Sequence, residues 1–459
     1  MRREVLLRFS QTPGMDSSTI PPPLPGLAVE DNSNHEVNST GAARRPAESP
    51  RVPIGFLLSQ PAGPPTIINM HFRTTIVTLL TGVIALSSAL PSAQSDSRKS
   101  SEAQHSKGKH TGKEQCSDPI VRREWRHLSM HQRKDYLRAV KCMMAKPPKL
   151  GSYAEGITTR WEDFIWIHQS MMPMVHWVGH FLPWHRLFLY EYERVLREEC
   201  GYAGGVPYWD QSKDYRDILA SPLLNGEVSF GGNGKYDPDA PLSRLPTFPT
   251  FDYTGGGCIH SGAFKDEVIH LGHTNDSSYH ERCLKRNIVR EPAREWLKPS
   301  REVDVLKNPN YERFAVALEG NLDWNTDFGI HNAGHLCIEG DMADVFISPG
   351  DPLFYVFHAN IDRIWWKWQQ ANPSARRFDV GNPIAPRVPL FADLYPNPPP
   401  GNVTLDFELT MGPLGGNRLT VETARVMDTR GTTPDEFEAG LLCYTAWPGS
   451  GGGKEWDGV

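Results

Sequence analysis

The stretch HWVGHFLPWHR, residues 176–186, contains three histidines and one proline within eleven positions. His176 and His185 are nine residues apart, and at about 100° per residue a straight helix would point them to opposite faces. Pro183, which lies between them, breaks a helix. The stretch therefore predicts a helix that ends before a turn and a second helix that His185 opens, so that both imidazoles can be aimed at one point.

His168 lies eight residues before His176, in the apolar stretch 164–174, for which we predict a helix. It can join the other two as a third ligand of one metal ion. His180 is a rival for one of these places, because it follows His176 by four residues and would share a helix face with it. Spacing alone leaves the choice between His176 and His180 open.

A second group of histidines lies further along the chain. His331 and His335 are four residues apart, so on a helix they share one face. The residues between them lack the glutamate of a zinc-protease HExxH motif. His358 lies in the stretch 353–370, a helix for which Asp351 and the proline after it form a favourable start.

Two groups of three histidines predict a binuclear metal site inside a bundle of helices. A di-iron bundle would contain glutamate ligands, and a mononuclear zinc enzyme would need only one group. Ligation by imidazole alone, together with secretion, favours copper. Asp362, four residues after His358, is expected to accept a hydrogen bond from the other N–H of a ligand imidazole.

The composition is that of a globular protein, with 39% hydrophobic and 22% charged residues in 459. A net charge of −6 and a pI near 6.3 argue against nucleic acid as a partner. We expect one mainly α domain over 116–459, with long loops in 206–263 and a minor β element in 402–447. Alternating residues over 403–409 predict a strand there.

A segment near the start of the sequence has the layout of a secretory signal peptide. A basic Met70–Arg73 is followed by an apolar, uncharged stretch over 74–90 and by small residues up to Ala93. We therefore predict a signal peptide at 70–93, a mobile leader at 94–115, and an extension at 1–69 that is disordered or not translated. The protein is expected to be extracellular, with no membrane span after cleavage.

Seven cysteines without a CxxC pair fit a few disulfides and one remaining thiol in a secreted protein. Asn275 and Asn402 each begin an Asn-x-Ser/Thr tripeptide, the acceptor for N-glycosylation.

Two long motifs carry a resemblance to a known family. Residues 176–191 resemble the first-copper motif, and residues 351–363 the second-copper motif, of the tyrosinase and polyphenol oxidase (catechol oxidase) family of type 3 copper proteins. The short interval between the first two histidines is similar to that of short secreted fungal members. The family spacing selects His176 over His180. The resemblance implies two copper ions, and its six ligands are His168, His176, His185, His331, His335 and His358.

The resemblance also implies an activity. Family members use dioxygen to oxidise small phenols: o-diphenols become o-quinones, and tyrosinases, acting as monooxygenases, also hydroxylate monophenols. In members that do so, an asparagine and a glutamate hold a water that deprotonates the phenol; Asn332 and Glu319 are the corresponding candidates. Phe354, one turn before His358, is expected to pack against ligand rings. Met174 stands where some fungal members have a cysteine bonded to a histidine, so that cross-link is not expected.

Two alternatives to a general phenol oxidase remain. One is an oxidase dedicated to a single phenolic intermediate of a secondary-metabolite pathway. The other is an oxygen carrier of haemocyanin type, which shares the two-copper centre but buries it and assembles into large oligomers.

Overall fold

The computed structural model describes residues 118–240, 248–326, 328–395, 397–415, 420–430 and 442–446. All of them belong to one compact unit of the chain, Ala103–Val459. The extension, signal peptide and leader predicted at 1–69, 70–93 and 94–115 lie outside the described residues.

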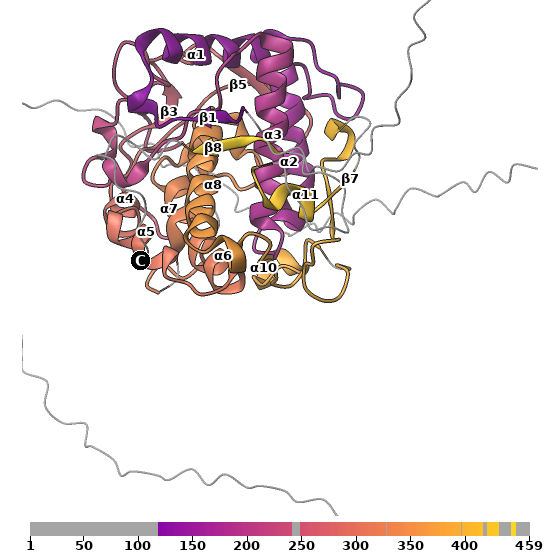
Figure 1. Cartoon of the computed structure of the whole chain (residues 1–459). Coiled ribbons are helices and arrows are strands. Elements are labelled where there is room, and N and C mark those ends of the chain that lie inside the picture. Colours follow the sequence, from indigo (N-terminus) through magenta and orange to yellow (C-terminus); the bar gives the residue numbers. More distant parts are fainter. Residues whose placement is uncertain are drawn as a thin grey trace, which may run out of the picture. The chain divides into compact units, whose positions relative to one another are not determined.

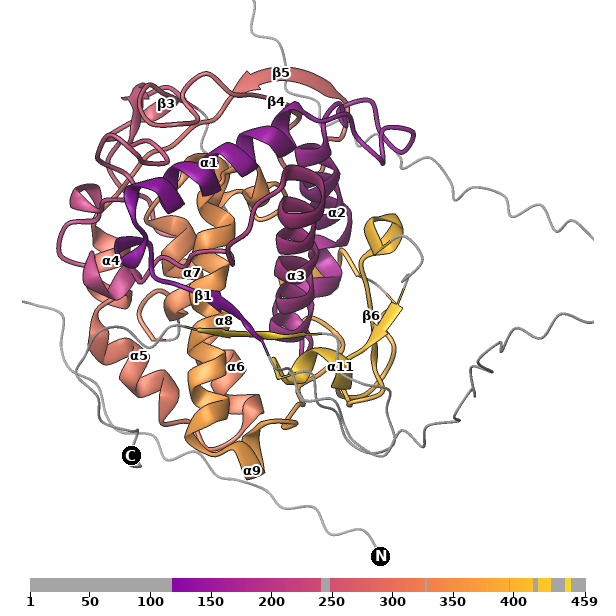
Figure 2. The ribbon, with the colours of Figure 1, turned by 45° about the horizontal axis from the view of Figure 1, so that its top comes forward.

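Four helices form the centre of this unit and carry the histidines of interest. They are α2 (Arg160–Val175), α3 (Phe181–Cys200), α7 (Gly329–Leu336) and α8 (Leu353–Ala371). α3 packs against both α2 and α8, and α7 packs against α8; Figures 1 and 2 show the magenta pair beside the orange pair. α1 (Met130–Ala145) lies against α2 and α3. The mainly α fold predicted from the sequence is confirmed.

Local signals in the sequence set the ends of these helices. α1 begins with a capping box, in which Ser129 and Gln132 each bond the other's backbone N–H. Thr159 and Glu162 form the same arrangement at the start of α2. α3 ends at Gly201, whose φ of 65° is in the left-handed region that glycine adopts without strain.

Shorter helices surround the central four. The α-helices are α4 (Glu291–Trp296), α5 (Pro299–Leu306), α6 (Tyr311–Glu319), α9 (Pro373–Arg376), α10 (Pro389–Ala392) and α11 (Ala424–Met427). Single turns of 3₁₀-helix are η1 (Trp125–His127), η2 (Gln211–Lys213), η3 (Ile218–Ala220), η4 (Gly340–Ala343), η5 (Ser348–Gly350) and η6 (Gly412–Gly415). Among the described helices, none combines the length and the apolar character that crossing a bilayer requires.

The β structure is minor, as predicted. The described residues form four sheets of two strands each. β1 (Ile120–Arg122) pairs in parallel with β8 (Tyr444–Ala446), and the antiparallel pairs are β2 (Gly234–Tyr236) with β3 (Gly256–Ile259), β4 (Val268–Leu271) with β5 (Tyr279–Cys283), and β6 (Glu408–Thr410) with β7 (Thr420–Glu422).

The strand predicted over 403–409 is wrong in extent. The alternation does describe burial, since Val403 and Leu409 are buried and the residues at even positions between them are exposed. However, only β6 pairs in a sheet, because the backbone turns where the N–H of Phe407 bonds the carbonyl of Thr404.

A buried ionic network connects α3 and α8 to the sheet formed by β1 and β8. The Asp362 carboxylate accepts hydrogen bonds from Arg186 (2.5 Å), Arg122 (3.0 Å) and the Tyr444 hydroxyl. The Arg122 guanidinium also bonds Glu193 at 3.0 Å and lies 3.7 Å from the centre of the Tyr444 ring. The prediction that Asp362 bonds a ligand imidazole is therefore wrong, because two buried arginines occupy its oxygens.

The cysteines follow the predicted pattern of disulfides and one remaining thiol. Cys142 is bonded to Cys200, and Cys258 to Cys283. Cys443 is also disulfide-bonded. Cys337 is a free, buried thiol directly after α7.

Candidate metal centre

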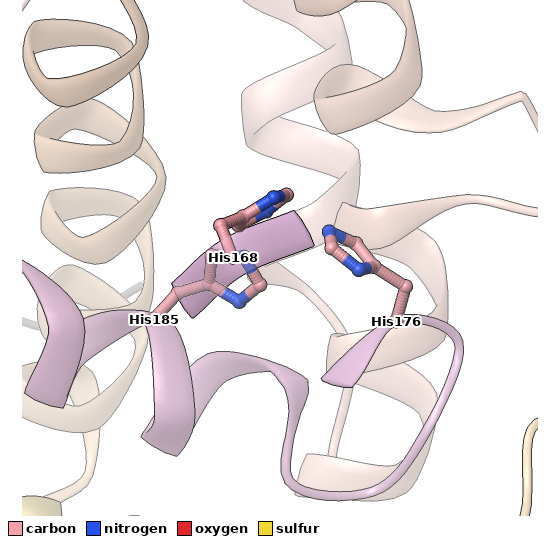
Figure 3. Close-up of side chains that lie close together, drawn as sticks. All are labelled: His168, His176 and His185. Carbon is pink, nitrogen blue, oxygen red and sulfur yellow. The ribbon is translucent and has the colours of Figure 1, made fainter. Parts of the chain in front are cut away.

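The first triad of histidines comes from α2, α3 and the turn between them. His168 lies within α2, His176 is the residue at which α2 ends, and His185 lies in the second turn of α3. The chain reverses at Trp177, whose φ of 53° is left-handed. One nitrogen of each histidine lies within 4.8 Å of the others, and Figure 3 shows the three side chains drawn together from these positions.

The start of α3 differs from the prediction that His185 opens a helix. α3 begins at Phe181, and Pro183 lies in its first turn. A proline is tolerated there because the first N–H groups of a helix have no acceptor within it. The His180 ring packs against Phe407, with 4.7 Å between ring centroids, and lies outside the triad.

The second triad comes from α7 and α8. His331 and His335 share one face of α7, as the spacing predicts, and His358 projects from α8. The Nε2 atom of His335 lies 3.1 Å from that of His331 and 3.2 Å from that of His358. Two ligands on a tetrahedral ion, each about 2.0 Å from it, are about 3.3 Å apart. The spacing of the three nitrogens thus fits a metal ion.

Backbone carbonyls orient four of the six imidazoles. The Nδ1–H groups of His168, His176, His185 and His335 donate to the carbonyls of Phe346 (2.8 Å), Met172 (3.0 Å), Phe181 (2.9 Å) and Met342 (2.7 Å) respectively. A proton on Nδ1 leaves the lone pair of Nε2 free for a metal. The Nε2 atoms of His168 and His185 are buried without a hydrogen-bond partner among the described residues, as the arrangement requires.

Burial keeps these imidazoles neutral. His335 is partly buried and the other five are buried. Burial lowers the pKa of His176 to about 4 and that of His335 to about 3. Burial also lowers the pKa of His168, His185, His331 and His358 well below the usual range, and repulsion between neighbouring imidazoles adds to the effect. A neutral imidazole can bind a metal through an unprotonated nitrogen, which is Nε2 in the four histidines whose Nδ1–H bonds a carbonyl.

Two phenylalanine rings join the triads. Phe354 lies 4.1 Å from the ring of His358 and 5.4 Å from that of His168. This confirms the predicted packing of Phe354 against the histidine rings of the two triads. Phe181 lies 4.6 Å from His185 and 4.7 Å from His331. Each ring therefore contacts both triads, which lie close together.

Glu319 and Asn332 each lie beside one histidine of a triad, Glu319 next to the residue that follows His176 and Asn332 directly after His331. Glu319, at the end of α6, is buried and accepts the backbone N–H of Trp177 at 2.5 Å. Burial raises its pKa to about 7, against the opposing effects of Arg387 and of that N–H. The Asn332 side chain follows His331 and donates its amide to the carbonyl of Asn321 at 2.8 Å.

Arg387 is a residue of this site that sequence analysis did not identify. Its guanidinium lies 2.7 Å from Glu319 and donates to the Gly320 carbonyl (2.9 Å) and the Asn321 side chain (3.2 Å). It thus holds the loop whose Asn321 carbonyl fixes Asn332. The side chain comes from a loop 68 residues from Glu319 in the sequence, where no motif marks it.

A helical core in which two triads of neutral imidazoles meet defines a binuclear metalloprotein. Residues 158–371 match the family model described as the common central domain of tyrosinase. The chain is 34% identical over 344 residues to the tyrosinase-like protein phomQ1 of Diaporthe leptostromiformis, covering 72% of this chain and 78% of that one. It is 30% identical to the N-acetyl-6-hydroxytryptophan oxidase ivoB of Emericella nidulans, covering 72% and 93%.

A solved structure gives the same assignment. A variant of the polyphenol oxidase of Thermothelomyces thermophila matches with a TM-score of 0.62 and 33% identity, covering 72% of this chain and 89% of that one. The chain therefore belongs to the tyrosinase family, whose centre holds two type 3 copper ions. It is a copper-dependent oxidoreductase.

Proposed function

We propose that the six histidines bind the two copper ions and that the enzyme oxidises o-diphenols to o-quinones with dioxygen. Bound copper would supply dioxygen binding and the acceptance of two electrons from the phenol. The observation that carries the proposal is the pair of triads, which meet at Phe181 and Phe354 and in which four of the six imidazoles donate Nδ1–H to a backbone carbonyl.

Ring stacking and backbone hydrogen bonds hold the centre in a fixed geometry. The rings of His185 and His358 stack across the two triads with 4.7 Å between centroids. Four backbone carbonyls hold the ligand rings in their orientations. A neutral ligand set adds no negative charge, so it suits a metal ion that changes between the 1+ and 2+ states.

We extend the proposal to monophenol hydroxylation, with Glu319 and Asn332 holding the water that takes the phenol proton. A carboxyl with a pKa near 7 can accept a proton at neutral pH. The amide of Asn332 is fixed by its bond to the Asn321 carbonyl, which leaves the side-chain oxygen as an acceptor. Glu319→Gln is expected to lower monophenol hydroxylation and to leave o-diphenol oxidation within about twofold.

A dedicated phenolic substrate is the second candidate. Relatives with 30–34% identity include an oxidase named for a single substrate, N-acetyl-6-hydroxytryptophan. The present enzyme would then act on one phenolic intermediate and only weakly on simple catechols.

The test compares substrates on the copper-loaded full chain. A panel of o-diphenols, monophenols and 6-hydroxyindoles is followed by oxygen uptake and quinone absorbance. Turnover of simple o-diphenols supports the general oxidase, and turnover restricted to one member supports the dedicated oxidase. Reversible oxygen binding without turnover of any phenol would overturn both and leave the oxygen carrier.

Matched histidine variants test the ligand assignment. His358→Ala is expected to lose activity and to bind about one copper ion per chain, because one triad is broken. His180→Ala removes a buried histidine outside both triads and is expected to retain two. Full copper content and activity in His358→Ala would refute the assignment.

We also propose that the protein is secreted, from a start at Met70. The disulfides Cys142–Cys200 and Cys258–Cys283 support an oxidising compartment. N-terminal sequencing of protein from the culture medium tests this, since a mature start upstream of Met70 would contradict it.

A further inference from the structure

One short segment contacts a ligand of each triad. This segment, residues 341–346, connects α7 to the turn before α8 and is called here the bridging segment. Its Met342 carbonyl accepts the Nδ1–H of His335 at 2.7 Å. Its Phe346 carbonyl accepts the Nδ1–H of His168 at 2.8 Å. A shift of this segment would therefore turn one imidazole in each triad.

The two triads differ in how their other histidines are oriented. In the first triad, His176 and His185 are oriented by carbonyls of their own neighbourhoods. In the second triad, the Nδ1 atoms of His331 and His358 have no hydrogen-bond partner among the described residues. His335 is thus the member of that triad whose ring is held by the backbone, and the bridging segment holds it.

Asp344 fixes the bridging segment. Its carboxylate is buried, and Oδ1 accepts the backbone N–H of Phe346 at 3.1 Å. Oδ2 accepts the backbone N–H of Thr274 at 2.8 Å. A buried carboxylate that accepts two N–H groups makes stronger hydrogen bonds than a neutral acceptor. The Nδ1 atom of His273 lies 3.7 Å from Oδ2.

A continuous set of hydrogen bonds links Asp344 to the helix that carries His168. Thr274, whose N–H bonds Asp344, accepts the side-chain amide of Gln169 at 2.8 Å through its carbonyl. Gln169 is the residue after His168 on α2. The hairpin between β4 and β5 therefore holds both the helix that carries His168 and the segment that orients its ring.

We propose that Asp344 is a positioning residue that couples the two triads, because the segment it fixes orients His168 in one and His335 in the other. The proposal rests on the six histidines being the metal ligands. Loss of a partner that orients a ligand typically weakens metal binding about 10- to 100-fold. Here a single substitution outside both triads is expected to weaken both.

The test separates the two triads. Zn²⁺ is titrated into the metal-free full chain carrying His358→Ala, which leaves the first triad, or His168→Ala, which leaves the second. Each background is compared with and without Asp344→Ala. We expect zinc affinity to fall about 10- to 100-fold in both backgrounds, with a smaller fall for Asp344→Asn, which retains an oxygen for Phe346.

A second measurement detects orientation rather than folding. The visible spectrum of the Co²⁺-loaded chain reports ligand geometry and is expected to change in Asp344→Ala. Asp214→Asn is the matched control, since Asp214 is buried outside the bridging segment and its carboxylate accepts the indole N–H of Trp209 at 2.8 Å. It is expected to lower stability while the cobalt spectrum stays that of the wild type.

The outcomes are distinct. If Asp344→Ala weakens zinc binding in only one background, or in neither, the coupling is refuted. If neither single-triad background binds zinc before Asp344 is changed, the ligand assignment fails instead. If Asp344→Ala does not fold, Gln169→Glu replaces it in the test. This variant places a carboxylate against the Thr274 carbonyl and so disturbs the same set of hydrogen bonds. Unchanged zinc affinity in both backgrounds then refutes the proposal.

Discussion

Replacement of Glu319 by glutamine is expected to change how the stability of the protein depends on pH. The carboxyl group is buried beside Arg387, and burial raises its pKa from 4.5 to about 7. A raised pKa means that the folded state resists ionisation of this group more than the unfolded state does. Stability contributed by the protonated group is therefore present below pH 4.5 and is lost as the pH rises through 7.

The magnitude follows from the pKa. The rise in the pKa of Glu319 from 4.5 to about 7, at about 1.4 kcal/mol per pH unit, corresponds to about 3 kcal/mol of unfolding free energy. Between pH 5 and pH 8 the wild type is expected to lose about 2–3 kcal/mol through this group. In the Gln variant the amide N–H groups face Arg387, which lowers the unfolding free energy by the same amount at every pH. The pH-dependent contribution of the carboxyl group to the unfolding free energy is absent.

Urea unfolding of the copper-loaded protein at pH 5, 6, 7 and 8 measures the effect. The difference in unfolding free energy between Glu319→Gln and wild type is expected to shift by about 2–3 kcal/mol in favour of the variant over this range. Glu312→Gln, which removes an exposed carboxyl from the same helix, is measured beside it as the matched control. A difference for Glu319→Gln that does not change with pH would refute the raised pKa and with it the role of Glu319 as a proton acceptor.

Three further changes test the fold and the compartment. Asp362→Ala leaves the buried Arg186 without its carboxylate partner and removes one of the two carboxylates that bond Arg122, so it is expected to lower unfolding free energy by about 3–5 kcal/mol in urea titrations; a loss below about 1 kcal/mol would contradict this. Gly179→Ala would place a Cβ 2.3 Å from the Gly381 carbonyl, so a lower melting temperature is expected, and an unchanged one would show that the two loops separate easily. Asn275 is exposed between β4 and β5; Asn275→Gln is expected to reduce the mass of the secreted protein by one N-glycan, and equal masses after secretion would rule out modification there.

The sequence predicted the helices and the meeting of the histidines because both depend on local spacing. The four-residue interval of His331 and His335 fixes a shared helix face, and the nine-residue interval of His176 and His185 requires a turn. The choice against His180 needed more than spacing. It depends on where α2 ends, and the left-handed Trp177 after His176 is not marked by any residue preference.

Contacts between distant segments could not be predicted in this way. The Phe346 carbonyl that orients His168 is 178 residues away in the sequence and depends on the backbone, so no side-chain type signals it. Asp362 was predicted correctly as a hydrogen-bond acceptor but given the wrong partners. Helical spacing places it one turn from His358, yet Arg122 and Arg186 approach it from other segments and compete for its oxygens.

The parallel pairing of β1 and β8 has a consequence for how the chain matures. β1 is formed by residues 120–122, whereas its partner strand is residues 444–446, so this sheet closes a loop of more than three hundred residues. During synthesis, Arg122 has no access to Tyr444 until almost the whole domain has emerged from the ribosome. β1 can therefore pair only after β8 has been synthesised. A nascent chain that lacks β8 is expected to keep β1 unpaired and to stay bound to chaperones.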